Sequence, residues 1–478
     1  MQTVHFSIAD IAIIFLYFFI IIYIGIRYVK VKKNDVANYL VAGRSLTLPS
    51  FVASLVSTWY GGILGTGEYS YKYGISNWLV FGIPYYIFAL IFALLLAERV
   101  RKAELFTIPD KLYLTYGKGV GLMGSFFVFF TVVPASYVLM LAVLLKLLFG
   151  WSILTGLIIG SIFSICYIYF GGLGSVVKTD IIQFILMYIG FAVIIPFAGF
   201  KYGGFSFLKS NLPPLHLTWH GGNSLQYIIV WFFIAMWTLI DPGFHQRCYA
   251  AKSGTTARRG ILISIFFWFI FDAMTTFTGL YSRAIIPGID PMMSYPLLGD
   301  LILPPFIKGL FFVGILSTIM STVDSLSFLS AVTIGRDFMW RILGGDESKV
   351  NLYTKFGLIL SGIISIAIAF LIPSVVKIWY TIGTIFIPGL IFPLVSSYFP
   401  PLKINSKFIL ATGISGWLTS FLWILIGQIN KVNYSPQYPM NIEPMYPGLI
   451  IALIVYLTGY IFQKFEKRGV KLPLNFPS

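Results

Sequence analysis

Long apolar segments recur along almost the whole chain, and they constrain its fold more than any other feature. About thirteen of them approach the roughly 20 apolar residues that a membrane-spanning helix needs. The predicted spans are 8–28, 47–71, 76–97, 119–148, 151–170, 178–200, 225–247, 258–283, 305–335, 352–373, 376–399, 406–428 and 446–464. Only 10% of the 478 residues are charged, against about 25% in soluble proteins, so a bilayer must solvate the surface. The sequence therefore predicts an all-α membrane protein with one transmembrane domain over 1–478.

The basic residues lie mainly in the short segments between these spans, so the net charge of +16 indicates a membrane surface rather than nucleic acid as the partner. With the N-terminus outside, most of the 33 Lys and Arg residues fall on the inner side, among them Arg44, Arg101 and Arg247. No basic residue precedes the first apolar run, so we expect that run to be retained as a helix. The pattern predicts a multi-pass protein of the cell (inner) membrane with a cytoplasmic C-terminus.

Two spans contain helix-breaking residues near their middle. The second contains Gly61 and Gly62, and the seventh contains Asp241-Pro242-Gly243. Transporters built from inverted repeats place their sites at such paired interruptions, although glycine and proline also serve ordinary helix packing. The five-span spacing predicts two repeats, helices 2–6 (47–200) and helices 7–11 (225–399). An N-terminal helix and inner loop (1–46) would precede them, and two helices (406–464) would follow.

The ninth span is rich in hydroxyl groups. Five hydroxyl residues and one carboxylate fall within 317–325, and Ser317, Ser321 and Asp324 share one helix face. Oxygen ligands without nearby nitrogen or sulfur are what a hard, weakly held cation requires. Charge inside a membrane is costly and usually functional. Acids lie in or beside the spans at Glu68, Asp180, Asp241, Asp272 and Asp324.

These motifs resemble the sodium:solute symporter family, which has the LeuT-type inverted-repeat fold. The resemblance is carried, over about 8–430, by 39–46 (YLVAGRSL), 171–180 (GGLGSVVKTD) with Gln183, Asp241-Pro242 with Gln246-Arg247, Met320-Ser321-Thr322 and Asp324-Ser325. It implies a sodium ion (Na⁺) bound by the backbone carbonyls of Ser57, Tyr60 and Thr318 and by the hydroxyls of Ser321 and Thr322. It also allows a second sodium at Asp180, Asp324 and Ser325.

The same resemblance places the solute between helices 2 and 7. Trp237 matches an aromatic gate of sugar-transporting members, and Gly61, Gly62, Tyr137 and Tyr380 are further candidate lining residues, with ordinary aromatic packing as the alternative. Positions that are polar in sugar transporters are apolar here, at Phe81, Pro84 and Ile234. An amino acid, a monocarboxylate or a similar small metabolite is therefore expected.

The function predicted from these features is sodium-coupled solute import by alternating access. A proton-coupled transporter of the same fold, with Asp180, Asp272 or Asp324 as carrier, is an alternative, as are a solute sensor and a channel. An enzyme is not expected, because the sequence has no His-Cys metal spacing, phosphate loop or nucleophile elbow. The expected partners are sodium, a small solute and the lipid bilayer.

Overall fold

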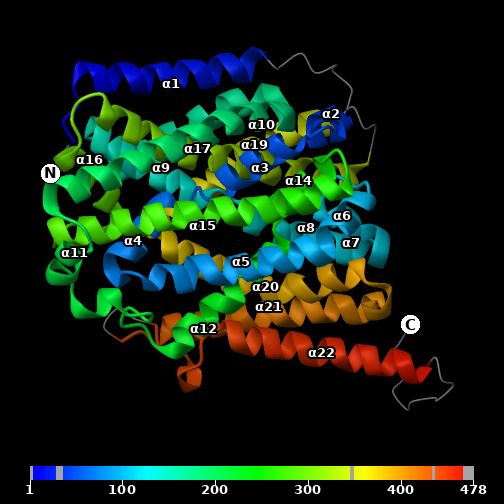
Figure 1. Cartoon of the computed structure of the whole chain (residues 1–478). Helices are drawn as coiled ribbons and strands as arrows, with labels where there is room; N and C mark the ends of the chain where they lie inside the picture. The colour runs from blue at the N-terminus through cyan, green and yellow to red at the C-terminus, as the bar shows by residue number, and fades with distance from the viewer. Residues whose placement is uncertain (1–3, 28–35, 345–348, 433–435, 467–478) are drawn as a thin grey trace.

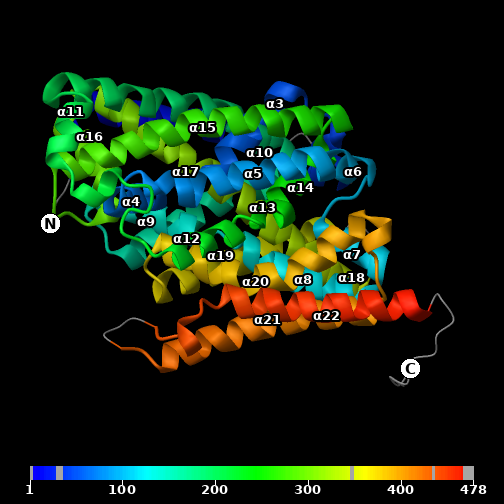
Figure 2. The same ribbon diagram turned by 60° about the horizontal axis from the view of Figure 1, so that its bottom comes forward.

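The computed structural model describes residues 4–27, 36–344, 349–432 and 436–466, and within them it is helical with no strand. The long helices run side by side across the molecule (Figures 1 and 2). Several basic residues of the predicted inner segments, namely Lys30, Lys32, Lys33, Lys467, Arg468 and Lys471, lie outside the described residues. An all-helical bundle is expected because a helix satisfies its backbone hydrogen bonds internally, as the hydrocarbon requires.

The first half contains α1 (Ile8–Arg27), α2 (Val36–Val41), α3 (Leu48–Trp59), α4 (Ile63–Tyr73), α5 (Ile83–Ile91), α6 (Ala97–Lys102), α7 (Ile108–Tyr116), α8 (Lys118–Val132), α9 (Ala135–Phe149), α10 (Ile153–Tyr202) and α11 (Phe205–Asn211). The second half contains α12 (Leu225–Ile234), α13 (Trp237–Ile240), α14 (Pro242–Ala250), α15 (Gly254–Ile285), α16 (Ser294–Ile302), α17 (Ile307–Val332), α18 (Arg341–Leu343), α19 (Val350–Leu371), α20 (Val375–Tyr398), α21 (Ser406–Ile429) and α22 (Met445–Glu466). Helical turns at Trp78–Gly82 and Phe92–Leu96 extend α5 at its two ends.

Among the described residues, eleven helical segments are long and apolar enough to cross a bilayer. The predicted number of about thirteen is therefore not confirmed. The two missing spans are present as shorter apolar helices, Leu48–Trp59 and Ile153–Phe163. Leu48–Trp59 is short because the predicted span 47–71 is interrupted after it. Ile153–Phe163 forms the N-terminal part of α10.

Interruptions occur both where the sequence predicts them and elsewhere. The second span is divided into α3 and α4, and the seventh into α12, α13 and α14. A third break lies at Pro134, between α8 and α9. The apolar pattern does not predict it, because the run 119–148 is continuous. Between the predicted spans 5 and 6, α10 consists of two helices that meet at a kink at Gly172, whose φ of 60° a residue without a Cβ adopts at low cost.

The helix α17 forms the centre of the bundle. In the apolar window of Ile307–Leu343, 94% of the residues are buried, compared with 22% for α1 and 28% for α22. The last two therefore lie at the periphery, on opposite edges of the molecule in Figure 1. Because α17 packs against both α3 and α10, the hydroxyl-rich segment faces the break in the second span.

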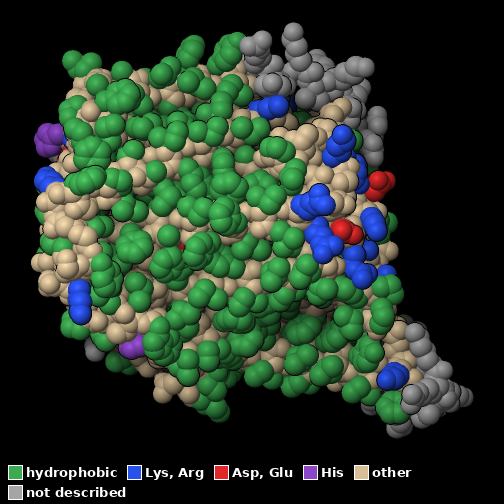
Figure 3. Space-filling view, viewed as in Figure 1, with side chains coloured by type: hydrophobic (Ala, Val, Ile, Leu, Met, Phe, Trp, Pro, Cys, Tyr) green, Lys and Arg blue, Asp and Glu red, His purple; other side chains and the backbone are tan. Residues whose placement is uncertain are grey.

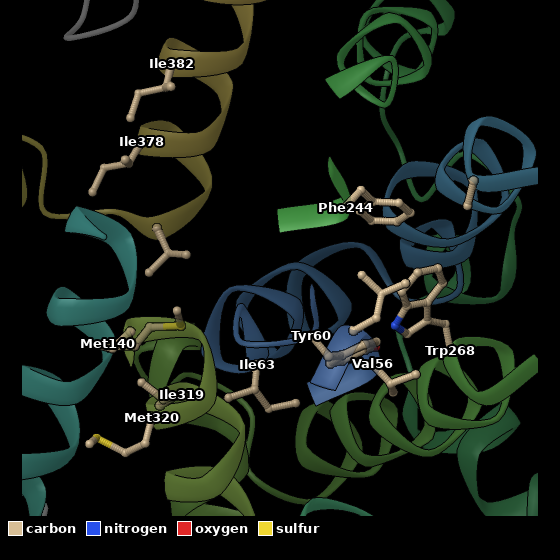
Figure 4. Close-up of a cluster of buried hydrophobic side chains, with 14 of the residues drawn as sticks. Val56, Tyr60, Ile63, Met140, Phe244, Trp268, Ile319, Met320, Ile378 and Ile382 are labelled. Carbon is tan, nitrogen blue, oxygen red and sulfur yellow. The ribbon is translucent and has the colours of Figure 1, made fainter. Parts of the chain in front are cut away.

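Apolar side chains surround that break. Figure 4 shows Val56, Tyr60 and Ile63 on its two sides, with Ile319 and Met320 of α17 on one flank and Phe244 and Trp268 on the other. Outside the bundle, a broad apolar surface covers the helices (Figure 3). Lys and Arg side chains gather at one end of it, where α6 ends and α15 begins. The exposed basic residues of this end include Arg99, Lys102, Lys252, Arg258 and Arg259. This distribution is typical of a protein embedded in a bilayer.

Candidate functional site

The break between α3 and α4 lies directly against α17. A Cβ atom on Gly61 would lie only 1.8 Å from Thr322 Oγ1, so glycine is what allows the two backbones to approach this closely. Tyr60 is the C-cap residue of α3. A helix end leaves its last carbonyl groups without intrahelical donors, and here those groups lie beside the hydroxyl-rich helix.

The hydroxyl of Thr322 connects the two segments. It donates a 2.6 Å hydrogen bond to the carbonyl of Thr58 and lies 3.5 Å from the carbonyl oxygen of Ser57. Within its own helix it lies 3.4 Å from the carbonyl oxygen of Thr318. The structure thus brings Ser57, Thr318 and Thr322 together as a cluster of neutral oxygens, next to Tyr60.

The hydroxyl of Ser321 extends this cluster towards a carboxylate. It donates to Asp180 Oδ1 at 2.6 Å and lies 2.9 Å from Ser57 Oγ. Asp180 also accepts a 2.6 Å hydrogen bond from Ser54. All five predicted sodium ligands therefore lie on the two facing segments, α3 with its C-cap and α17, and a carboxylate from α10 lies behind them.

A buried arginine is the fixed counter-charge of this cluster. Arg247 of α14 is fully buried and lies 3.6 Å from Asp180 Oδ2. It donates to Ser325 Oγ at 2.6 Å, to Thr58 Oγ1 at 2.9 Å and to Ser54 Oγ at 3.2 Å. The sequence predicts Arg247 among the charges on the inner side, whereas in the structure it lies within α14 and is fully buried. Two of the three candidates for a second sodium, Asp180 and Ser325, contact this guanidinium, and the third, Asp324, is buried nearby on α17.

The second break, between α13 and α14, is stabilised by a side-chain cap on the following helix. Asp241 caps α14, because its carboxylate accepts a 2.8 Å hydrogen bond from the backbone N–H of Phe244. Pro242 follows at the first helical position, where its missing N–H costs nothing. The short helix α13 precedes this break and carries Trp237.

A cavity lies between the two breaks, with a volume of about 1040 Å³ that includes open solvent. It is lined by Thr58, Trp59, Tyr60, Gly62, Thr66, Phe81, Tyr85, Thr131, Val133, Ser136, Tyr137, Ile234, Trp237, Asp241, Gly243, Asp272, Thr322, Leu326, Trp379 and Ile382. Of the predicted solute residues, Gly62, Tyr137 and Trp237 line it. Gly61 instead packs on Thr322, and Tyr380 points elsewhere, since its hydroxyl donates to Glu443.

Comparison with known proteins identifies the family. The model of the sodium:solute symporter family matches residues 39–388. The chain belongs to this family. A sodium/proline symporter 2 of Staphylococcus saprophyticus is 24% identical over 98% of this chain and 95% of its own length. A sodium/proline symporter of Staphylococcus aureus is 25% identical over 95% and 92%.

Solved structures support the fold of this symporter. A Na⁺-coupled sialic acid symporter superimposes with a TM-score of 0.75 at 16% identity, over 96% of this chain and 98% of its own. A nucleobase-cation-symport-1 family transporter gives a TM-score of 0.60 at 12% identity, over 91% and 97%. The chain therefore has the LeuT-type inverted-repeat fold. Its function is sodium-coupled solute import rather than an enzymatic reaction.

Several residues of the symporter's site are not found by reading the sequence. Arg247, Ser54 and Thr58 complete the polar cluster, and Trp379, the neighbour of Tyr380, lines the cavity. A signal for Arg247 does exist, because it follows Asp241-Pro242 within a predicted span. Its partner Asp180 is 67 positions away, so the pairing is a property of the folded chain.

Proposed function

We propose that this symporter imports a small organic solute together with one sodium ion, which is held where α3 ends against α17. The carbonyls of Ser57, Tyr60 and Thr318 and the hydroxyls of Ser321 and Thr322 would bind the ion. The main support is the hydroxyl of Thr322, which lies within 3.5 Å of carbonyl oxygens from both segments. Neutral hydroxyl and carbonyl oxygens suit a hard cation that must be released again.

A second sodium at Asp180, Asp324 and Ser325 has a competitor within the protein. The guanidinium of Arg247 already contacts Asp180 and Ser325. A cation placed between the same oxygens would be repelled by this fixed charge at short range. We therefore propose coupling to one sodium ion.

The solute would bind in the cavity between the two breaks. We propose four residues that contact the solute. Three of them, Gly62, Tyr137 and Trp237, are also predicted from the sequence, and the fourth is Trp379. Gly61 would serve the contact between α3 and α17, and Tyr380 would act outside the cavity. Because relatives at 24–25% identity are named sodium/proline symporters, L-proline is the first solute to test.

The two breaks would belong to repeats over 47–200 and 225–399, with 1–46 and 406–464 added at the ends. The end of the molecule rich in exposed Lys and Arg would face the cytoplasm of the cell (inner) membrane. This orientation places the N-terminus outside and the C-terminus in the cytoplasm.

Coupling would follow from the contact between the ion and the α3–α4 break. Sodium would order the break and raise the affinity for the solute, and by linkage the solute would raise the affinity for sodium by the same factor. The membrane potential would then add about 2.3 kcal/mol per charge for each 100 mV.

The test is a Ser321→Ala/Thr322→Ala double variant in proteoliposomes with labelled L-proline, together with a sodium titration of the thermal unfolding temperature. We expect both sodium-stimulated uptake and sodium-dependent stabilisation to be lost. A matched control, Ser330→Ala/Thr333→Ala, removes the same two hydroxyl types at the C-terminal end of α17 and directly after it, and should keep both responses. Sodium dependence that survives in the first variant would refute the ligand assignment. Uptake that ignores sodium and follows pH would instead indicate proton coupling.

A further inference from the structure

The cavity combines negative charge with aromatic rings. Two carboxylates, Asp241 and Asp272, line it, and no Lys, Arg or His is found among the described residues of its wall. A solute that enters this space therefore meets acidic groups without a basic partner on the wall. The two carboxylates differ in what surrounds them.

Asp241 has both a structural role and a nearby positive charge. It caps α14, and Arg247 lies on the next turn of the same helix. A Cβ atom on Gly243 would lie 2.8 Å from Asp241 Oδ1 and 3.8 Å from Arg247 Nη1, so the guanidinium lies near this carboxylate, although its ion pair is with Asp180. The charge of Asp241 is thus partly balanced by the protein.

Asp272 lies near the middle of α15 and is 2% exposed. Its two carboxylate oxygens accept hydrogen bonds from the hydroxyls of Tyr60 and Tyr86. None of the ion pairs within the described residues includes it. A carboxyl group buried inside a membrane is either protonated or paired with a positive charge, and an intramembrane acid is a functional site by default.

Aromatic rings surround the same space. Trp59 and Tyr85 lie with their ring centroids 5.5 Å apart, and Tyr137 and Trp379 with theirs 6.2 Å apart. Phe81 packs 5.8 Å from Trp379. Ring faces attract organic cations, above all where water is excluded, whereas they offer nothing to a carboxylate.

We propose that the transported solute carries a positively charged nitrogen, and that Asp272 pairs with this nitrogen in the cavity. The inference rests on the proposed function and narrows its solute class. An amine, or an amino acid through its ammonium group, can pair with Asp272, whereas a monocarboxylate has no positive charge to offset the repulsion from the two acids.

Tyr60 connects this solute site to the ion. Its carbonyl is one of the proposed sodium ligands, and its hydroxyl donates to Asp272. The same residue thus contacts both sites, which gives sodium a direct route to position the carboxylate that meets the solute.

The experiment compares matched probes that differ in the charged nitrogen. L-proline, pyrrolidine and cyclopentanecarboxylate share a five-membered ring, and choline is paired with 3,3-dimethyl-1-butanol. Each is added to the purified full-length symporter with and without sodium, and the thermal unfolding temperature is measured. We expect at least one ammonium probe to stabilise the protein in sodium, and its nitrogen-free partner to have no effect.

An Asp272→Asn variant should bind that ammonium probe roughly 10-fold or more weakly, since a charged hydrogen bond is lost. It should still respond to sodium alone, which also shows that it is folded, and Asp272→Glu should restore part of the preference. The inference is overturned if cyclopentanecarboxylate stabilises as well as L-proline, if no ammonium probe stabilises, or if Asp272→Asn binds unchanged. If sodium does not raise the thermal unfolding temperature of the unmodified protein, the proposed ion site is refuted instead.

Discussion

Substituting Gly61 tests the contact on which the sodium site depends. In a Gly61→Ala variant the new Cβ would lie 1.8 Å from Thr322 Oγ1 and 2.2 Å from Thr322 Cβ. Because the φ of Gly61 is not in the left-handed region, alanine is not strained by its own backbone. Rotation of the Thr322 side chain does not move its Cβ, so the methyl group can be accommodated only if the backbones of the break and α17 separate.

This separation moves the hydroxyl of Thr322 away from the carbonyls at the end of α3, so the proposed ligand set is disrupted. Overpacking of a well-packed core costs about 1–3 kcal/mol. If this cost falls on the sodium-bound arrangement, sodium affinity falls roughly 5- to 150-fold. The assay is a sodium titration of the thermal unfolding temperature, which needs no knowledge of the solute.

A Gly119→Ala variant is the matched control, because a Cβ there would meet only Leu410 Cδ2 at 3.8 Å, an ordinary contact. It should leave the sodium midpoint unchanged. An unchanged midpoint in Gly61→Ala would refute the reasoning, since the ion would then not depend on the contact between the break and α17.

Three further outcomes are expected. Arg247→Met leaves Asp180 buried without its counter-charge and should cost about 3–5 kcal/mol of unfolding free energy, part of which Asp180→Asn should restore in the same chain. Asp10→Ala removes the carboxylate that accepts the N–H groups at the start of α17, at 2.8 and 2.9 Å, and thermal unfolding should show a loss of about 1–2 kcal/mol. The pKa of Glu443, in the connection between α21 and α22, is raised because burial disfavours the charged carboxylate. The hydrogen bond from Tyr380 opposes this shift of the pKa but does not cancel it. The folded state therefore retains this proton more readily, so stability should fall as pH rises through the ordinary glutamate range near pH 4.3 and up to the raised pKa. Glu443→Gln should flatten the pH profile of the unfolding temperature in that range, and an unaltered profile would contradict the assignment.

Much of the fold and part of the candidate site can be predicted from short segments of the sequence. Apolar runs predict the spans because the bilayer admits helices whose backbone groups are internally bonded. Gly61-Gly62 and Asp241-Pro242 mark breaks that the structure contains, because glycine and proline act on their own backbone. The kink at Gly172 and the break at Pro134 have the same local origin, although the apolar run over 119–148 does not predict the second of them.

The sequence by itself determined that this chain is a helical membrane protein and that a hydroxyl-rich segment and two loosened helices exist in it. Only the tertiary structure decided which groups meet. It placed Thr322 against the end of α3, gave Asp180 the guanidinium of Arg247, and left Asp272 at the cavity wall with two phenols as its partners. The physical reason is that side-chain periodicity reports which face of a helix is buried, whereas charge pairing and ligand geometry depend on contacts between residues far apart in the chain.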